Sequence, residues 1–207
     1  MPIARALSTL NARSSQCDSL IASAHRIDQE GRPMFSQLDR EQITIAAFLN
    51  LFVAWEEFIE CCFASFMAGA ATLSGRLPSK HASPPSADLA KKMLIGTQRY
   101  FDYANHEHVR KMAAIYFDSG YPFEAPISSI FGDLGDLRTM RNSSAHISSS
   151  TQIALESLAQ RIFGLPQPDI TLYKMLTAVD PRSDTGNTVY GDARDKLLVT
   201  AGLIAQG

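Results

Sequence analysis

Cysteine and positive charge are both scarce in this chain of 207 residues. The three cysteines, Cys17, Cys61 and Cys62, show neither the spacing of metal ligands nor a disulfide pattern. They fit small core residues in a reducing compartment, and we expect no metal and no other cofactor. The formal net charge is −2, so an RNA partner would need a local basic patch.

Long apolar runs are also missing. The longest uncharged apolar stretch runs from Gln42 to Trp55 and is too short to span a bilayer. Residues 1–16 contain no apolar segment of signal-peptide length. The sequence therefore predicts a soluble, cytoplasmic protein that makes no contact with a membrane.

Helical periodicity is what the chain does contain. Nothing alternates strongly enough for a sheet, and no repeat, glycine-rich phosphate loop or Ser-His-Asp pattern is found. With 45% hydrophobic residues, the chain can bury one sizeable core. We expect one all-α helical bundle over residues 1–207. Apolar spacing predicts helices at residues 4–29 (one or two segments), 37–69, 87–117 (two helices or one kinked helix), from about 133, 151–163, 169–178 and 192–205.

One arginine interrupts an apolar stripe in the helix that begins near Asp133. At 100° per residue, Arg141 falls in line with Ile130, Leu134, Leu137 and Ala145. A guanidinium there is costly unless it is paired or faces a cavity or a partner. Asn142, two serines, Ala145 and His146 follow. A permanently charged arginine and a histidine that titrates near neutrality suit phosphate chemistry. Alternatively, the arginine pairs with a helix carboxylate and the histidine caps a helix end.

The stretch Arg141-Asn142-Ser143-Ser144-Ala145-His146 resembles the Arg-Asn-x-x-Ala-His signature of the HEPN superfamily of small helical domains. Trp55-Glu56 in the helix at 37–69 is similar to the second helix of the RiboL-PSP group of that superfamily. The resemblance implies a HEPN-type bundle with additional C-terminal helices. It also implies a metal-independent endoribonuclease in which Arg141, Asn142 and His146 form the catalytic site.

The chemistry of these residues permits that reaction. RNA carries its own nucleophile, the 2′-hydroxyl, whose proton a neutral imidazole can accept. A guanidinium stabilises the charge that builds on the phosphoryl oxygens. The expected products are a 2′,3′-cyclic phosphate and a 5′-hydroxyl. One His146 does not readily serve as both acid and base, and HEPN proteins typically pair their motifs across a homodimer.

The geometry adds a condition. On a straight helix Arg141 and His146 lie about 140° apart, so the helix must end or bend near Ser143-Ser144, or a second subunit must complete the site. We expect Leu134, Leu137 and Ala145 to form an exposed apolar patch that the dimer buries.

Glu56 is the fourth predicted catalytic-site residue. Its phase falls inside the apolar arc of the helix at 37–69, where a carboxylate should have a raised pKa or meet a cation. Arg141 is the natural partner, and the pair would hold the guanidinium in one orientation. Equally, Glu56 could lie at the edge of this face and reach solvent.

Basic residues provide the candidate contacts to substrate. Lys91, Lys92 and Arg99 are near Tyr100, and basic and aromatic side chains together bind single-stranded RNA. Arg138, one turn before Arg141, is a further candidate. A charged outer helix face would explain the same residues. The basic loop at 76–85 is either a solvated loop or an arm that touches substrate or partner.

Two classes of function fit these observations. The first is an endoribonuclease acting as a toxin or defence enzyme, with a possible antitoxin protein as partner. The second is a catalytically inactive helical module for protein interaction or nucleotide binding that keeps the motif for structure.

Overall fold

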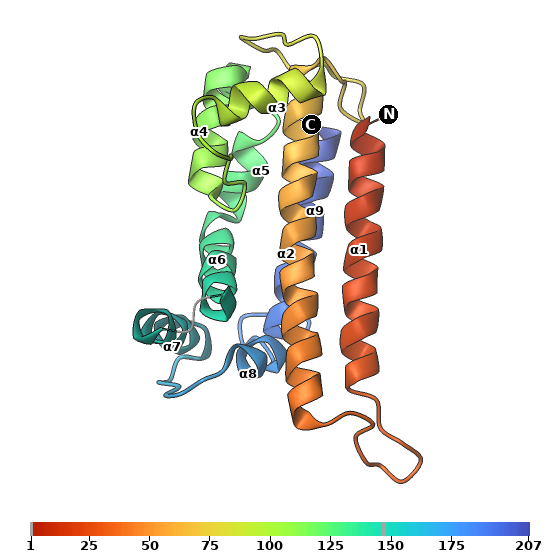
Figure 1. The fold of residues 1–207 in the computed structure, drawn as a ribbon, viewed down its shortest axis with the longest axis vertical. Helices are drawn as coiled ribbons and strands as arrows, with labels where there is room; N and C mark the ends of the chain where they lie inside the picture. Colours follow the sequence, from red (N-terminus) through yellow and green to blue (C-terminus); the bar gives the residue numbers. More distant parts are fainter. Residues whose placement is uncertain (1, 146–147) are drawn as a thin grey trace. The chain divides into compact units, whose positions relative to one another are not determined.

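The computed structural model describes residues 2–145 and 148–207, and helices are the only regular elements in this part of the chain (Figure 1). The all-α prediction is confirmed. The helices are α1 (Pro2–Ala24), α2 (Gln37–Met67), α3 (Ala87–Ile95), α4 (His106–Tyr116), a 3₁₀ turn η1 (Asp118–Gly120), α5 (Glu124–Ser129), α6 (Phe131–Ala145), α7 (Ser149–Phe163), α8 (Leu172–Thr177) and α9 (Val189–Gln206).

The chain folds as two compact units. The first unit comprises Met1–Asn11, Ala54–Leu134 and Lys196–Gly207, and the second comprises Ala12–Val53 and Gly135–Asp195. Four helices, α1, α2, α6 and α9, contribute residues to both units.

The first predicted helical region forms one continuous helix, α1, which ends at Ala24, five residues before the expected end. The sequence allows interruptions at Ser14, Ser15 and Asp18, yet these residues lie within the helix. Ser14 is only 2% exposed, and the carboxylate of Asp18 accepts hydrogen bonds from Tyr190 and Arg194. Tertiary partners therefore outweigh the weak helix propensity of these polar residues.

Helix α2 follows its sequence closely. Phe48, Phe52, Trp55, Ile59 and Phe63 recur at helical spacing, as predicted for a core-facing helix, and all are buried. Apolar spacing also predicts core positions that the structure leaves exposed: Leu20, Ile27, Leu89, Met93, Tyr100, Ile115 and Ile153. These predictions are wrong because periodicity alone does not show how wide a face the neighbouring helices cover.

Aromatic side chains form the core of the first unit. The rings of Phe63, Phe117 and Phe123 are fully buried, with centroids 4.8 Å apart for Phe63 and Phe123 and 5.2 Å for Phe63 and Phe117. Phe66 packs edge-on against Phe123 at 5.9 Å. This cluster joins the end of α2 to the segment between α4 and α5 (Figure 1).

Two side-chain contacts hold the basic loop at 76–85 in place. Nζ of Lys80 donates a hydrogen bond of 2.6 Å to the carbonyl of Met67, and the guanidinium of Arg76 lies 4.1 Å from the ring centroid of Tyr121. The predicted loop is confirmed, and it is an anchored loop. The segment 87–117 resolves into two helices, α3 and α4, where one kinked helix was the alternative.

Hydrogen bonds from charged side chains organise the second unit. Arg194 donates 2.8 Å from Nη1 to Asp18 and 2.7 Å from Nη2 to Asp195. Asp180, 1% exposed, accepts hydrogen bonds from the backbone and guanidinium of Arg182 and closes the loop at 180–187.

In the described part of the chain, no helix is both long and apolar enough to cross a membrane.

Glu124 and Arg110 provide a prediction for stability against pH. The Arg110 guanidinium donates from Nε at 2.9 Å and holds the pKa of the Glu124 carboxyl below its ordinary value. A depressed pKa contributes stability above the unfolded-state pKa of about 4.3, and this stability is lost as pH falls through the lower folded value. In urea denaturation, the wild type should therefore lose more stability between pH 7 and pH 3 than Glu124→Gln.

Asp184→Asn is a suitable control, since Asp184 is exposed and has no ion pair in the described part of the chain. Its pH dependence should match the wild type. Identical slopes for Glu124→Gln and wild type would show that the ion pair does not contribute.

Candidate active site at the end of helix α6

Helix α6 carries the predicted motif and is held by an ion pair in each unit. In the first unit, Lys196 Nζ lies 2.7 Å from Asp133 in the first turn of α6. In the second unit, the guanidinium of Arg161 on α7 pairs with Asp136, whose side chain is only 13% exposed. Asp133 thus lies in the first turn of α6, where a carboxylate is favourable beside the positive end of the helix dipole. Asp136 instead connects α6 to α7 through its ion pair with Arg161.

The apolar stripe of α6 is buried within the chain. Leu134, Leu137 and Met140 are 3%, 2% and 2% exposed. The expectation that Leu134 and Leu137 form an exposed patch for a dimer to cover is therefore wrong. Periodicity identified the stripe correctly, but one chain already covers it. Met140, which the stripe prediction left out, belongs to the buried side as well.

Arg141 lies four residues before the end of α6 and is half-buried. Its Nη1 donates to Oδ1 of Asn142 over 3.4 Å, a long hydrogen bond. Within residues 2–145 and 148–207 the guanidinium has no ion pair, so its charge is available to an anion. This distinguishes Arg141 from Arg161 on α7, which is neutralised by Asp136.

Two serines close the helix after Arg141. Ser143 Oγ donates 2.7 Å to the carbonyl of Met140, and Ser144 Oγ donates 2.7 Å to the carbonyl of Arg141. Because α6 runs to Ala145, these two carbonyls also lie within reach of the helical N–H groups four residues on. Back-bonding hydroxyls of this kind compete with the helical hydrogen bonds and weaken the helix locally, close to its end.

Helix α6 continues through Ser143-Ser144 and ends at Ala145. The serine-rich run at 147–150 predicts that the chain leaves the helix or bends there, and Ser148 does have extended backbone angles. Ser148 caps α7 through a reciprocal bond with Thr151, and Ser149 and Ser150 form the first turn of α7. The predicted catalytic His146 lies outside the described residues.

The other predicted catalytic and substrate-contacting residues near the motif belong to different units. Asn142 and Arg138 belong to the second unit with Arg141, and both are half-buried. Arg138 is already engaged within the chain. Glu56 belongs to the first unit and is partly buried, with Oε1 enclosed. Its pairing with Arg141 stays a prediction.

Carboxylates neutralise much of the predicted RNA-contacting region. Lys91 lies 3.4 Å from Glu60, Lys111 lies 2.7 Å from Glu107, and Arg110 pairs with Glu124. Three of the five Lys and Arg residues at 87–117 are thus paired with a carboxylate, which favours the alternative of a charged outer helix face. Lys92 and Arg99 are exposed and have no ion pair in the described part of the chain, and Tyr100 beside them is 67% exposed.

Sequence reasoning missed a groove in the first unit between α1 and α2, with a volume of about 640 Å³. Small residues such as Ala6 and Ala54 border it, and their pattern resembles ordinary core. The described residues contain no group of three or more His, Cys, Asp or Glu side chains that could hold a metal ion.

A substitution at Leu137 distinguishes burial in the core of one chain from burial at a dimer interface. Leu137→Ala should lower the free energy of unfolding by about 2–5 kcal/mol, because it removes a side chain packed inside its own chain. The loss, measured by urea denaturation, should be the same at low and high protein concentration. Ile153→Ala, at a site 62% exposed, should change stability by less than about 0.5 kcal/mol. A Leu137→Ala effect that depends on protein concentration would restore the interface interpretation.

Comparison with known proteins adds no relative to this description. No family model, no curated protein and no solved structure matches the chain. The geometry around Arg141 is therefore the basis for assigning a function.

Proposed function

We propose that the chain is a metal-independent endoribonuclease of HEPN type, with Arg141 and His146 as its catalytic residues. The observation that carries the proposal is the guanidinium of Arg141. It lies four residues before the end of α6, a helix with one buried face, and is half-buried, without an ion pair among the described residues and five positions before a histidine. A cation kept in that position has a cost unless an anion uses it.

Each residue has a role that its chemistry supports. Arg141 is fixed by the packed stripe of α6 and stabilises the charge on the phosphoryl oxygens as the 2′-hydroxyl attacks. His146 accepts the proton of that hydroxyl, or donates one to the leaving 5′-oxygen. Asn142 contacts the guanidinium through Oδ1 and limits its rotation. Atoms balance without water in this step, because the P–O2′ bond forms as the P–O5′ bond breaks.

Contact with RNA is a separate part of the proposal. Lys92, Arg99 and Tyr100 are the exposed residues that remain as contacts in the predicted basic region of the first unit. A toxin or defence role, with an antitoxin as partner, is the biological setting that the resemblance implies. A helical module without catalysis is the alternative, and the cleavage experiment separates the two.

Cleavage of mixed RNA in the presence of EDTA is the direct test. The wild type should produce 2′,3′-cyclic phosphate and 5′-hydroxyl ends. His146→Ala should reduce the rate by about 10²–10⁴-fold, the usual value of proton transfer. Arg141→Ala should reduce it by about 10²–10³-fold through lost electrostatic stabilisation. Far-UV circular dichroism and the melting temperature should stay close to wild type.

His81→Ala and Arg26→Ala are the matched controls, because both residues are exposed and outside the motif. They should cleave at the wild-type rate. Activity that disappears with EDTA and returns with magnesium would contradict the mechanism. A wild-type protein that binds RNA or nucleotide without cleaving it would favour the non-catalytic module.

Assembly is a separate prediction. Because one histidine does not easily act as acid and base in the same step, we propose that two chains join their motifs in a homodimer. Burial of Leu134 and Leu137 within the chain means that polar residues near Arg141, and not the apolar stripe, would face the second copy. Light scattering at micromolar concentration should give the mass of a dimer.

Mixing two inactive variants tests whether the sites are composite. A heterodimer of Arg141→Ala and His146→Ala chains keeps one arginine and one histidine on opposite subunits, so the mixture should regain part of the activity. Each variant alone should remain inactive. A monomer that cleaves RNA at full rate would remove the dimer and require a second acid within one chain.

A further inference from the structure

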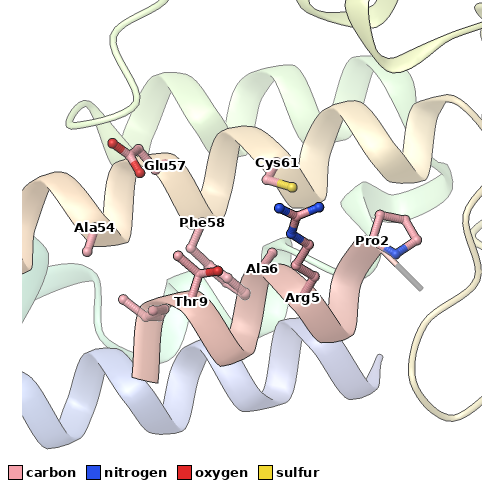
Figure 2. Close-up of a pocket in the computed structure, with 9 residues that line it drawn as sticks. Pro2, Arg5, Ala6, Thr9, Ala54, Glu57, Phe58 and Cys61 are labelled. Atoms are coloured by element: carbon pink, nitrogen blue, oxygen red, sulfur yellow. The ribbon is translucent and has the colours of Figure 1, made fainter. Parts of the chain in front are cut away.

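A groove in the first unit has the form of a small-molecule site and lies outside the motif. Its volume is about 640 Å³, and it lies between the start of α1 and the middle of α2 (Figure 2). Ligand sites typically measure about 300–1,000 Å³ and combine an apolar lining with a few polar groups. The groove exists because small side chains occupy this helix pair, with Ala6 on α1 and Ala54 on α2.

The floor of the groove is apolar. Ala6, Leu10, Ala54 and Phe58 line it and are 9%, 1%, 3% and 2% exposed, so they close its bottom with little exposed surface, while the exposed Pro2 and Thr9 form its rim. From Ala54 to Cys61 the helix advances about 10 Å at 1.5 Å per residue. An aliphatic chain of medium length fits along such a floor and gains stability by burying its apolar surface.

One positive charge at the groove is not neutralised. In Figure 2 the guanidinium of Arg5 extends from α1 toward Cys61, while the carboxylate of Glu57 lies on α2 away from it. Arg5 has no hydrogen bond or ion pair with the described residues, whereas Glu57 already has an interaction within the chain. The charge at the Arg5 end therefore complements an anion.

We propose that this groove binds a small anionic amphiphile, whose head group pairs with Arg5 and whose alkyl chain lies on Ala6, Leu10, Ala54 and Phe58. Guanidinium groups bind carboxylate and phosphate through two parallel hydrogen bonds. The assignment depends on neither His146 nor RNA cleavage, so it is independent of the proposed function.

Isothermal titration with octanoate and octyl phosphate tests the proposal on the full chain. At least one of them should bind, and the stronger ligand identifies the head group as carboxylate or phosphate. Octanol, without charge, and octylamine, with the opposite charge, should bind about tenfold more weakly or not at all. Hexanoate should bind more weakly than octanoate, because it buries two fewer methylene groups.

Two variants locate the site. Arg5→Gln should weaken the better anion about tenfold while leaving octanol unchanged, because it removes the charge and keeps the floor. Thr9→Phe, on the exposed rim, should block all ligands without altering the core. Arg99→Gln, an exposed arginine of the same unit outside the groove, is the control and should bind as wild type. Circular dichroism confirms that each variant is folded.

Absence of binding by both anions, equal binding of octanol and octanoate, or unchanged affinity in Arg5→Gln would each overturn the assignment.

Discussion

Burial of one face of α6 is the constraint on which the candidate site depends. Leu134, Leu137 and Met140 are almost fully enclosed, so the rotation of the helix about its axis is fixed. Arg141 follows in the same phase, one turn after Leu137, and its position is therefore set by apolar packing and not by a charged partner. Fixed in this way, a guanidinium can meet an anion without reorganising, which is the condition for electrostatic catalysis.

The ends of α6 are controlled by polar contacts of a different kind. Asp133 and Asp136 pair with lysine and arginine side chains of α9 and α7. At the other end, Ser143 and Ser144 bond back to carbonyls, and the helix stops at Ala145. The serines of the motif thus have a structural function whether or not the site is catalytic.

Most basic side chains near α3 and α4 form an ion pair with a carboxylate, which agrees with a net charge of −2 for the whole chain. Arg141 in the motif and Arg5 at the groove between α1 and α2 have no ion pair among the described residues, as is also true of the exposed Lys92 and Arg99. Arg141 and Arg5 belong to different units, and their surroundings differ. Arg141 follows a fully packed stripe, while Arg5 lies beside an open apolar floor.

The sequence alone determined the helical class and most helix positions, because 3.6-residue apolar periodicity and the proline-rich and glycine-rich breaks are local signals. It also located α2 and the basic loop at 76–85. Only the tertiary structure decided which apolar faces are covered: Leu20, Ile27 and Ile153 lie outside the core, and Leu137 lies inside it. Likewise, only the fold decided which charges are neutralised, since Lys91 meets Glu60 and Arg161 meets Asp136 across large sequence separations. Burial and ion pairing depend on contacts between distant segments, and periodicity within one segment does not encode them.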